Sequence, residues 1–177
     1  MKRKKIILLR HAQAIEQQDF SGNDFNRPLT EKWAKEAEQM AKYLRLIGVK
    51  LDHIIASPSI RTQETAKIFA DKFKIEEIEY FPELYNENRE KWTHGVDLYF
   101  NALVSTNEKH DVILVVWHNE DLTLLGQYLT GDGIPYMKKG STLVLSMPDD
   151  INPWHTLSSG MLEVDYYITP RFLELEI

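Results

Sequence analysis

The chain opens with a short apolar run that ends in two ionisable residues. Residues 5–11 read Lys-Ile-Ile-Leu-Leu-Arg-His, so aliphatic side chains fill Ile6 to Leu9 without polar alternation. A continuous run of this kind is typical of a strand that is buried on both faces, as in a parallel sheet covered by helices. Arg10 and His11 follow directly, so we expect them at the carboxyl end of the first strand.

The remainder of the chain alternates between helical and strand patterns. An apolar stripe at steps of four and three residues predicts a helix after the N-cap Thr30, and Gly48 ends it. Further helices are expected at about Ser59–Phe73, Arg89–Val104 and Glu120–Leu129, and further strands at His53–Ala56, Ile78–Phe81, Asp111–Trp117, Thr142–Met147 and, as a sheet edge, Met161–Ile168. This order predicts an α/β fold: a three-layer αβα sandwich around a mainly parallel central sheet, forming a single domain over residues 1–177.

Two segments between these elements lack regular patterning. Residues Gln17–Pro28 form a polar stretch with Gly22 and are predicted to be a loop. The segment Pro148–Gly160 is expected to be a hairpin loop or a short excursion, because it is too short to form a domain.

The composition excludes several classes of protein. With 177 residues, 43% of them hydrophobic and a net charge of −6, the chain is typical of a folded globular protein. An acidic chain lacks the global basic field that would hold nucleic acid. The absence of cysteine excludes disulfides, thiolate metal sites and cysteine nucleophiles. The apolar run Ile6–Leu9 is too short for a signal peptide or a membrane span, so we expect a cytoplasmic protein without a membrane partner.

Ionisable residues follow three of the predicted strands. In open α/β sheets, ligands bind outside the carboxyl ends of the strands. Arg10 and His11 follow the first strand, Arg61 lies shortly after the second, and His118 follows the most apolar one. A neutral imidazole can carry a phosphoryl group covalently, and arginines neutralise the charge of its oxygens. These residues therefore indicate phosphoryl transfer through a phosphohistidine.

Other interpretations of these residues stay open at this point. Arg10 could cap a strand edge, and Arg61 could pair with Glu64 on its own helix. A metal site would need three or four ligands at characteristic spacing, whereas no second histidine lies within a helical turn of His118 and the arginines would repel a cation. We therefore expect neither a metal nor a cofactor. The other histidines, which we predict to be structural or exposed, are His53, His94, His110 and His155.

Five short motifs, taken in order, resemble one enzyme family. They are Leu9–Ala12 (R-H-A), Asn26–Thr30 (R-P-L-T), Ser57–Ala66 (S-P-x-x-R-x-x-x-T-A), Pro82–Tyr85 and Trp117–Asn119 (H-N). Together they are similar to the histidine phosphatase superfamily, and the R-P-L-T element resembles its SixA-like phosphohistidine phosphatase branch. The resemblance implies a phosphoglycerate mutase-like fold and a single histidine phosphatase domain over residues 1–177.

The resemblance also implies a role for each matching residue. His11 would be the nucleophile, Arg10 and Arg61 would clamp the phosphoryl group, and His118 would complete the pocket. Asn119 would bind substrate with the help of the helix N-terminus, where backbone N–H groups favour anions. The substrate would be a phosphorylated protein carrying phosphohistidine or a small phosphorylated metabolite, and nothing in the sequence predicts an oligomeric state.

The sequence departs from the family at the general acid. Many members carry Glu at the end of an L-x-E element, but this chain has Asn86 there, with Glu87 one residue further on and Glu83 three residues earlier. Glu87 is the candidate acid, although a shift of one residue on a strand turns a side chain to the other face. Imidazole leaves more easily than an alkoxide, so a pocket without an acid would favour phosphohistidine over phosphate esters.

Two further expectations concern the pocket and the rival functions. Ala12 and Trp117 stand where the family has glycine, and we expect Trp117 to face the helices rather than line the pocket. The rivals are a small-molecule phosphomonoesterase, whose acid would be Glu87 or a rim acid, and a weakly catalytic phosphate- or phosphoprotein-binding module. The acids that could rim the pocket are Asp19, Asp24 and Glu120. A protein substrate would dock on the loop 17–27 or on the segment 148–160.

Overall fold

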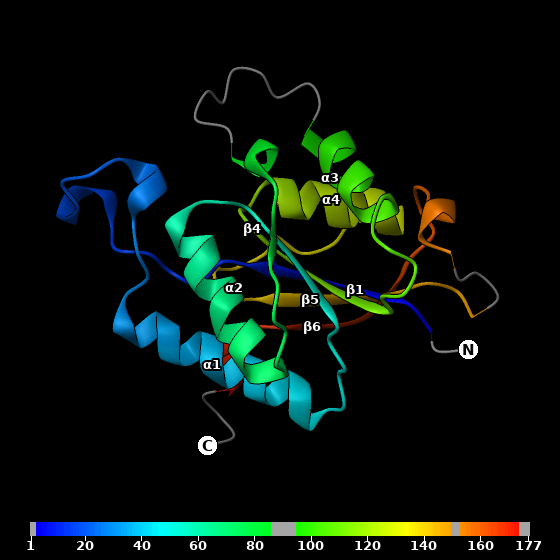
Figure 1. The fold of residues 1–177 in the computed structure, drawn as a ribbon, viewed down its shortest axis with the longest axis horizontal. Helices are drawn as coiled ribbons and strands as arrows, with labels where there is room; N and C mark the ends of the chain where they lie inside the picture. Colours follow the sequence, from blue (N-terminus) through cyan, green and yellow to red (C-terminus); the bar gives the residue numbers. More distant parts are fainter. Residues whose placement is uncertain (1–2, 86–94, 150–152, 174–177) are drawn as a thin grey trace.

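The computed structural model describes residues 3–85, 95–149 and 153–173, and these residues form one central sheet with helices on both faces (Figure 1). The strand order is β3-β2-β4-β1-β5-β6. The strands span Lys5–Arg10 (β1), His53–Ala56 (β2), Glu79–Tyr80 (β3), Val112–Trp117 (β4), Thr142–Ser146 (β5) and Glu163–Ile168 (β6). The helices span Glu31–Leu46 (α1), Ile60–Phe73 (α2), Gly95–Val104 (α3), Asp121–Thr130 (α4) and Pro170–Leu173 (α5), with shorter 3-10 helices at Gln17–Asp19 (η1), Asp24–Asn26 (η2), Pro82–Leu84 (η3) and Trp154–Thr156 (η5).

The sheet is mainly parallel, as predicted. Strand β4 pairs in parallel with β1 and β2, and β2 pairs in parallel with β3. The antiparallel pairings lie on the other side, where β5 joins β1 and β6 forms the edge. Strand β3 is shorter than the predicted Ile78–Phe81 because it pairs only with Ile55 and Ala56, and Pro82 then begins η3.

Helices cover both faces of the sheet, which confirms the three-layer arrangement. In Figure 1, α1 and α2 lie on one face and α3 and α4 on the other. Side chains of β1 alternate between two cores: Ile7 and Leu9 pack toward α1 and α2, whereas Ile6 and Leu8 pack toward α3 and α4. Burial on both faces explains why the run lacks polar alternation.

The helix boundaries follow from their capping residues. The Thr30 hydroxyl accepts a hydrogen bond from the Trp33 amide at 3.4 Å, which satisfies one amide of the first turn of α1. Gly48, with φ of 87°, follows that helix, and Gly131, with φ of 71°, caps α4. Both glycines adopt the left-handed conformation that other residues adopt only at a cost. None of the helices in the described ranges has both the length and the apolar character that a membrane span requires.

The segment between β5 and β6 is more structured than a simple hairpin loop. It contains η5, whose Trp154 is fully buried and donates its indole N–H to the His110 carbonyl at 2.8 Å. The ammonium group of Lys4 lies 4.6 Å from the centre of the same indole ring. This segment therefore extends the core at the amino end of β1 and β4.

Candidate active site

The strand order brings the predicted site residues to one edge of the sheet. Arg10 pairs with Trp117 across β1 and β4, so His11 and His118 leave the sheet from neighbouring strands. The His11 amide donates to the Trp117 carbonyl at 2.9 Å. Strand β2 lies on the other side of β4, and the segment that leads to Arg61 starts where the Ser57 amide donates to the Val116 carbonyl at 3.2 Å.

His11 is buried and held in one orientation. Its side chain lies next to His118, with the ring centres 5.1 Å apart in an edge-to-face arrangement. Nδ1 is 2.6 Å from the carbonyl oxygen of Ala12. Because a carbonyl oxygen can only accept, Nδ1 carries the proton, and Nε2 of the neutral ring therefore holds the free electron pair.

The surroundings of His11 keep its imidazole neutral. Burial is the largest influence and lowers the pKa of His11, the hydrogen bond to Ala12 raises it, and the positive charges of Arg61, Arg10 and Lys139 lower it further, to about 3. The charges of Arg10 and Arg61 thus act on the same ring. A histidine that is uncharged at neutral pH is competent as a nucleophile.

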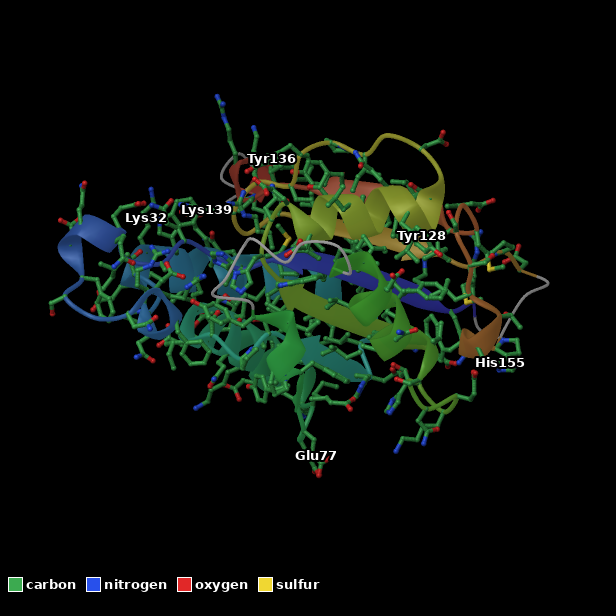
Figure 2. All side chains as sticks on the ribbon, turned by 90° about the horizontal axis from the view of Figure 1, so that it is seen from above. Lys32, Glu77, Tyr128, Tyr136, Lys139 and His155 are labelled. Carbon is green, nitrogen blue, oxygen red and sulfur yellow. The ribbon has the colours of Figure 1, made fainter. Side chains whose placement is uncertain are left out.

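Arg10 lies against the loop between α4 and β5. Its Nη1 donates to the Met137 carbonyl at 2.8 Å, and its guanidinium lies 5.7 Å from the centre of the Tyr136 ring. Burial lowers the pKa of Arg10, and Tyr136 offsets part of that effect. Figure 2 shows Tyr136 and Lys139 of this loop far along the molecule from His155. The Gly140 amide donates to the carbonyl of His11 at 3.2 Å, which ties the loop to the site.

Arg61 is in the first turn of α2 and is only 6% exposed. The alternative pairing with Glu64 is wrong, because a carboxylate oxygen of Glu64 instead accepts from the Leu29 amide at 2.6 Å. Arg61 contacts Asp24: Nη1 donates to the Asp24 carbonyl at 2.7 Å, and Nη2 donates to its Oδ2 at 3.0 Å. Asp24 lies within the predicted loop, in η2.

His118 and Asn119 are positioned by hydroxyl groups. Nε2 of His118 lies 3.1 Å from the Ser57 hydroxyl and 3.5 Å from the Ser59 hydroxyl. Oδ1 of Asn119, which precedes α4, accepts from the hydroxyl of Thr123 in the first turn of that helix at 2.7 Å. This bond orients the amide of Asn119 so that its nitrogen can serve as a donor.

Several buried polar atoms at this edge have no hydrogen-bond partner among the residues that the structure describes, and three of them are nitrogen donors of the predicted site residues. The three donors are Nε of Arg10, Nε of Arg61 and Nδ2 of Asn119. Leaving a buried donor unpaired costs about 1–3 kcal/mol, and more for a charged group, so such groups require an explanation. The oxygens of an anion are acceptors of the kind that these donors lack.

Sequence reasoning missed several residues of the site. The sequence indicates Asp24 only as one of several rim acids, and nothing in the sequence links it to Arg61. Tyr85 donates its hydroxyl to Oδ2 of Asp24 at 3.1 Å, and its ring lies 5.9 Å from that of His118. Lys139, whose positive charge contributes to the low pKa of His11, lies in none of the sequence motifs. The candidate acid Glu87, together with Asn86 and His94, lies outside the described residues.

The remaining features agree with their structural interpretations. Trp117 is fully buried and belongs to the core cluster that contains Leu122 and Leu125 of α4, so it faces the helices as expected. The rings of His53 and His110 stack at 4.4 Å, and His155 lies 3.4 Å from a carboxylate oxygen of Glu108. In the part of the chain that the structure describes, no three histidine or carboxylate side chains gather in a group that could hold a metal ion.

Comparisons with known proteins identify relatives of this arrangement. The family model described as histidine phosphatase superfamily (branch 1) matches residues 6–97. The mitochondrial serine/threonine-protein phosphatase Pgam5 of Drosophila melanogaster is 36% identical over 75 residues, which are 42% of this chain and 25% of that protein. The chain thus matches about a quarter of the length of that curated relative.

Solved structures share the fold over nearly the whole chain. The protein histidine phosphatase SixA, solved in complex with tungstate, superposes with a TM-score of 0.78 at 22% identity, covering 96% of this chain and 99% of that one. A mycobacterial glucosyl-3-phosphoglycerate phosphatase superposes with a TM-score of 0.64 at 14% identity, covering 93% and 98%. At these identities the similarity establishes the phosphoglycerate mutase-like fold.

Proposed function

Because the chain belongs to the histidine phosphatase superfamily (branch 1), we propose that it is a phosphatase that works through a phosphohistidine on His11. Nε2 of His11 attacks phosphorus, and the bond between phosphorus and the leaving group breaks as the new P–N bond forms. Water then attacks the phosphohistidine, phosphate departs, and the electron pair returns to Nε2. The nucleophile thereby divides one difficult displacement into two easier ones.

One observation carries this proposal: the neutral ring of His11, anchored by Nδ1 to Ala12 at 2.6 Å, has a free electron pair on Nε2. The proposed clamp consists of Arg10 and Arg61, whose unpaired Nε groups can donate to phosphoryl oxygens. Donors that are fixed before the reaction stabilise the charge of the transition state without reorganising. His118, 5.1 Å from the nucleophile between ring centres, is proposed to complete the pocket.

The substrate that we propose is phosphohistidine in a protein. Asn86 stands at the position where many family members carry an acid, and protonation by such an acid is worth ~10²–10⁴ in rate for an alkoxide leaving group. Imidazole is a better leaving group than an alkoxide, because its conjugate acid has a pKa of ~6.5. It therefore needs less protonation by the enzyme as it leaves. SixA, which has the same fold, is a protein histidine phosphatase. Asn119 is proposed to bind the substrate, and residues 1–177 are proposed to act as one catalytic domain.

Two expectations about the setting of this reaction remain predictions from the sequence. They are a cytoplasmic location and a reaction without metal or cofactor. The choice between the docking segments 17–27 and 148–160 also remains open to test by substitution.

The experiment that tests the proposed function compares substrates on the full chain. We expect turnover of a phosphohistidine peptide to exceed that of alkyl and sugar phosphates, and we expect His11→Ala to abolish it. His53→Ala is the matched control, because His53 is the first residue of β2 and lies at the opposite end of that strand from the site. Faster turnover of sugar phosphates would favour the phosphomonoesterase. Phosphate binding without turnover by the wild type would favour the binding module.

A further inference from the structure

We propose that Asp24 is a positioning residue. It binds the two terminal nitrogens of the Arg61 guanidinium, Nη1 and Nη2, and leaves the side edge that carries Nε for the phosphoryl group. The proposal rests on the proposed function, because it concerns how the same clamp is built. It gives a role to a loop residue that the family motifs of the sequence did not single out.

The contacts of Asp24 converge on one end of the Arg61 side chain. Its backbone carbonyl accepts from Nη1 at 2.7 Å and its Oδ2 accepts from Nη2 at 3.0 Å. One residue therefore engages both terminal nitrogens, once through the main chain and once through the side chain. Such a two-point contact fixes the plane of the guanidinium, which a single hydrogen bond does not.

The edge that Asp24 leaves open is the one that carries Nε. This atom is buried and has no acceptor among the residues that the structure describes. The guanidinium is a rigid planar fork, so fixing its end also fixes the direction of Nε–H and of the second Nη2 hydrogen. A phosphoryl oxygen pair can then bind this side edge while Asp24 remains in place.

Asp24 acts here as an anion and not as an acid. Burial raises its pKa, but Arg61, Arg27 and the Tyr85 hydroxyl lower it by more, so its pKa lies below the usual range. A carboxylate that stays ionised cannot protonate a leaving group at neutral pH. The same contacts therefore disfavour Asp24 as the rim acid of a phosphomonoesterase.

The loop that carries Asp24 is built to hold it. Arg27 donates from Nε to Oδ1 of Asp24 at 2.8 Å and from Nη1 to the Ile15 carbonyl at 2.8 Å. The side chain of Asn23 accepts from the Phe25 amide at 2.8 Å, which fixes the start of η2. The ring of Phe25 packs edge-to-face on that of Tyr85 at 4.8 Å. These contacts fix the position of Asp24. The conformational entropy that Asp24 loses when it binds Arg61 is therefore smaller.

A double-mutant cycle on tungstate affinity tests the proposal, with kcat and KM as a second measurement. The variants are Asp24→Ala, Arg61→Ala and both together, in the full chain. Asp24→Ala is expected to weaken tungstate binding about tenfold and to lower kcat/KM on the order of 10²-fold, as for a misplaced binding group. In the Arg61→Ala background, the same change is expected to alter tungstate affinity by less than about twofold, because contacting residues are coupled.

Two further variants serve as controls for this cycle. Asp24→Asn keeps the side-chain volume, so the cycle is repeated with it if Asp24→Ala unfolds at a lower temperature. Asp71→Asn removes an exposed carboxylate from the same helix as Arg61 and is expected to leave both measurements unchanged.

The outcomes separate this proposal from the proposed function. Equal losses from Asp24→Ala in both backgrounds would show that Asp24 does not act through Arg61 and would overturn the proposal. Turnover that needs His11 but is insensitive to both Asp24 and Arg61 would also overturn it, while the phosphatase proposal would stand. Coupled effects on tungstate affinity without turnover by the wild type would support the positioning role and overturn the phosphatase proposal.

Discussion

Nδ1 of His11 lies 2.6 Å from the carbonyl oxygen of Ala12, the next residue in the chain. This one contact decides the tautomer of the ring and directs Nε2 away from the backbone. Together with the burial of His11, it keeps the ring neutral and fixed, as the proposed role of nucleophile requires. The predictions below follow from this relationship and from the packing around it.

The stability of the protein should depend on pH through His11. The folded protein keeps this ring neutral down to a pKa of about 3, whereas the ring takes up a proton near its ordinary pKa of 6.5 when the chain unfolds. The unfolded state therefore binds more protons between these pH values, and the free energy of unfolding falls as the pH falls through this range. The contribution approaches about 1.4 kcal/mol per pH unit.

Chemical denaturation of the wild type and of His11→Asn at several pH values measures this effect. The variant lacks the titrating ring, so its free energy of unfolding should fall less steeply between about pH 6 and pH 4. The difference between the two proteins isolates His11 from the carboxylates that both share. Parallel curves for the two proteins would show that the ring has an ordinary pKa in the folded state.

Placing a glutamate at position 86, where many family members carry the acid, should change the substrate preference. We expect Asn86→Glu to raise turnover of alkyl phosphates by ~10²–10⁴, because a positioned acid protonates the alkoxide as it leaves. Turnover of a phosphohistidine peptide should change much less. Asn86→Gln is the matched control, since it lengthens the side chain without adding an acid. An equal increase with both substrates would contradict the explanation from leaving groups.

The tryptophan that precedes His118 should matter mainly for stability. Trp117 is fully buried between the sheet and α4, so Trp117→Ala should lower the free energy of unfolding by about 3–5 kcal/mol. Leu46→Ala, at a side chain that is 83% exposed, should change it by less than about 0.5 kcal/mol. Urea denaturation of both variants checks the difference, and a loss below about 1 kcal/mol for Trp117→Ala would mean that the core can close around the missing ring.

The strand ends of the site could be predicted from the sequence because local patterns determine them. Ile6–Leu9 and Val112–Val116 are apolar without interruption, so both had to be central strands, and their ends meet wherever they run parallel. This reasoning places His11 and His118 at one edge before any coordinates are known. The helix caps at Thr30 and Gly131 also depend only on neighbouring residues, so they too could be predicted from the sequence.

The features that could not be predicted depend on contacts between distant segments. Asp24 reaches Arg61 across 37 positions of the sequence, from a loop without periodicity. The shortness of β3 depends on how far β2 extends beside it. The contact between His11 and Ala12 is local, but it depends on the side-chain rotamer of a buried ring, which the packing of the surrounding loops selects.

The central claim is that a phosphoryl group is carried on His11, and trapping it is the most direct test. The enzyme is mixed with a phosphohistidine peptide, quenched at alkaline pH to preserve P–N bonds, digested and examined by mass spectrometry. We expect one phosphoryl group on the peptide that contains His11, and none on the corresponding peptide of His11→Asn. A phosphoryl group on another residue, or turnover that persists in His11→Asn, would contradict it.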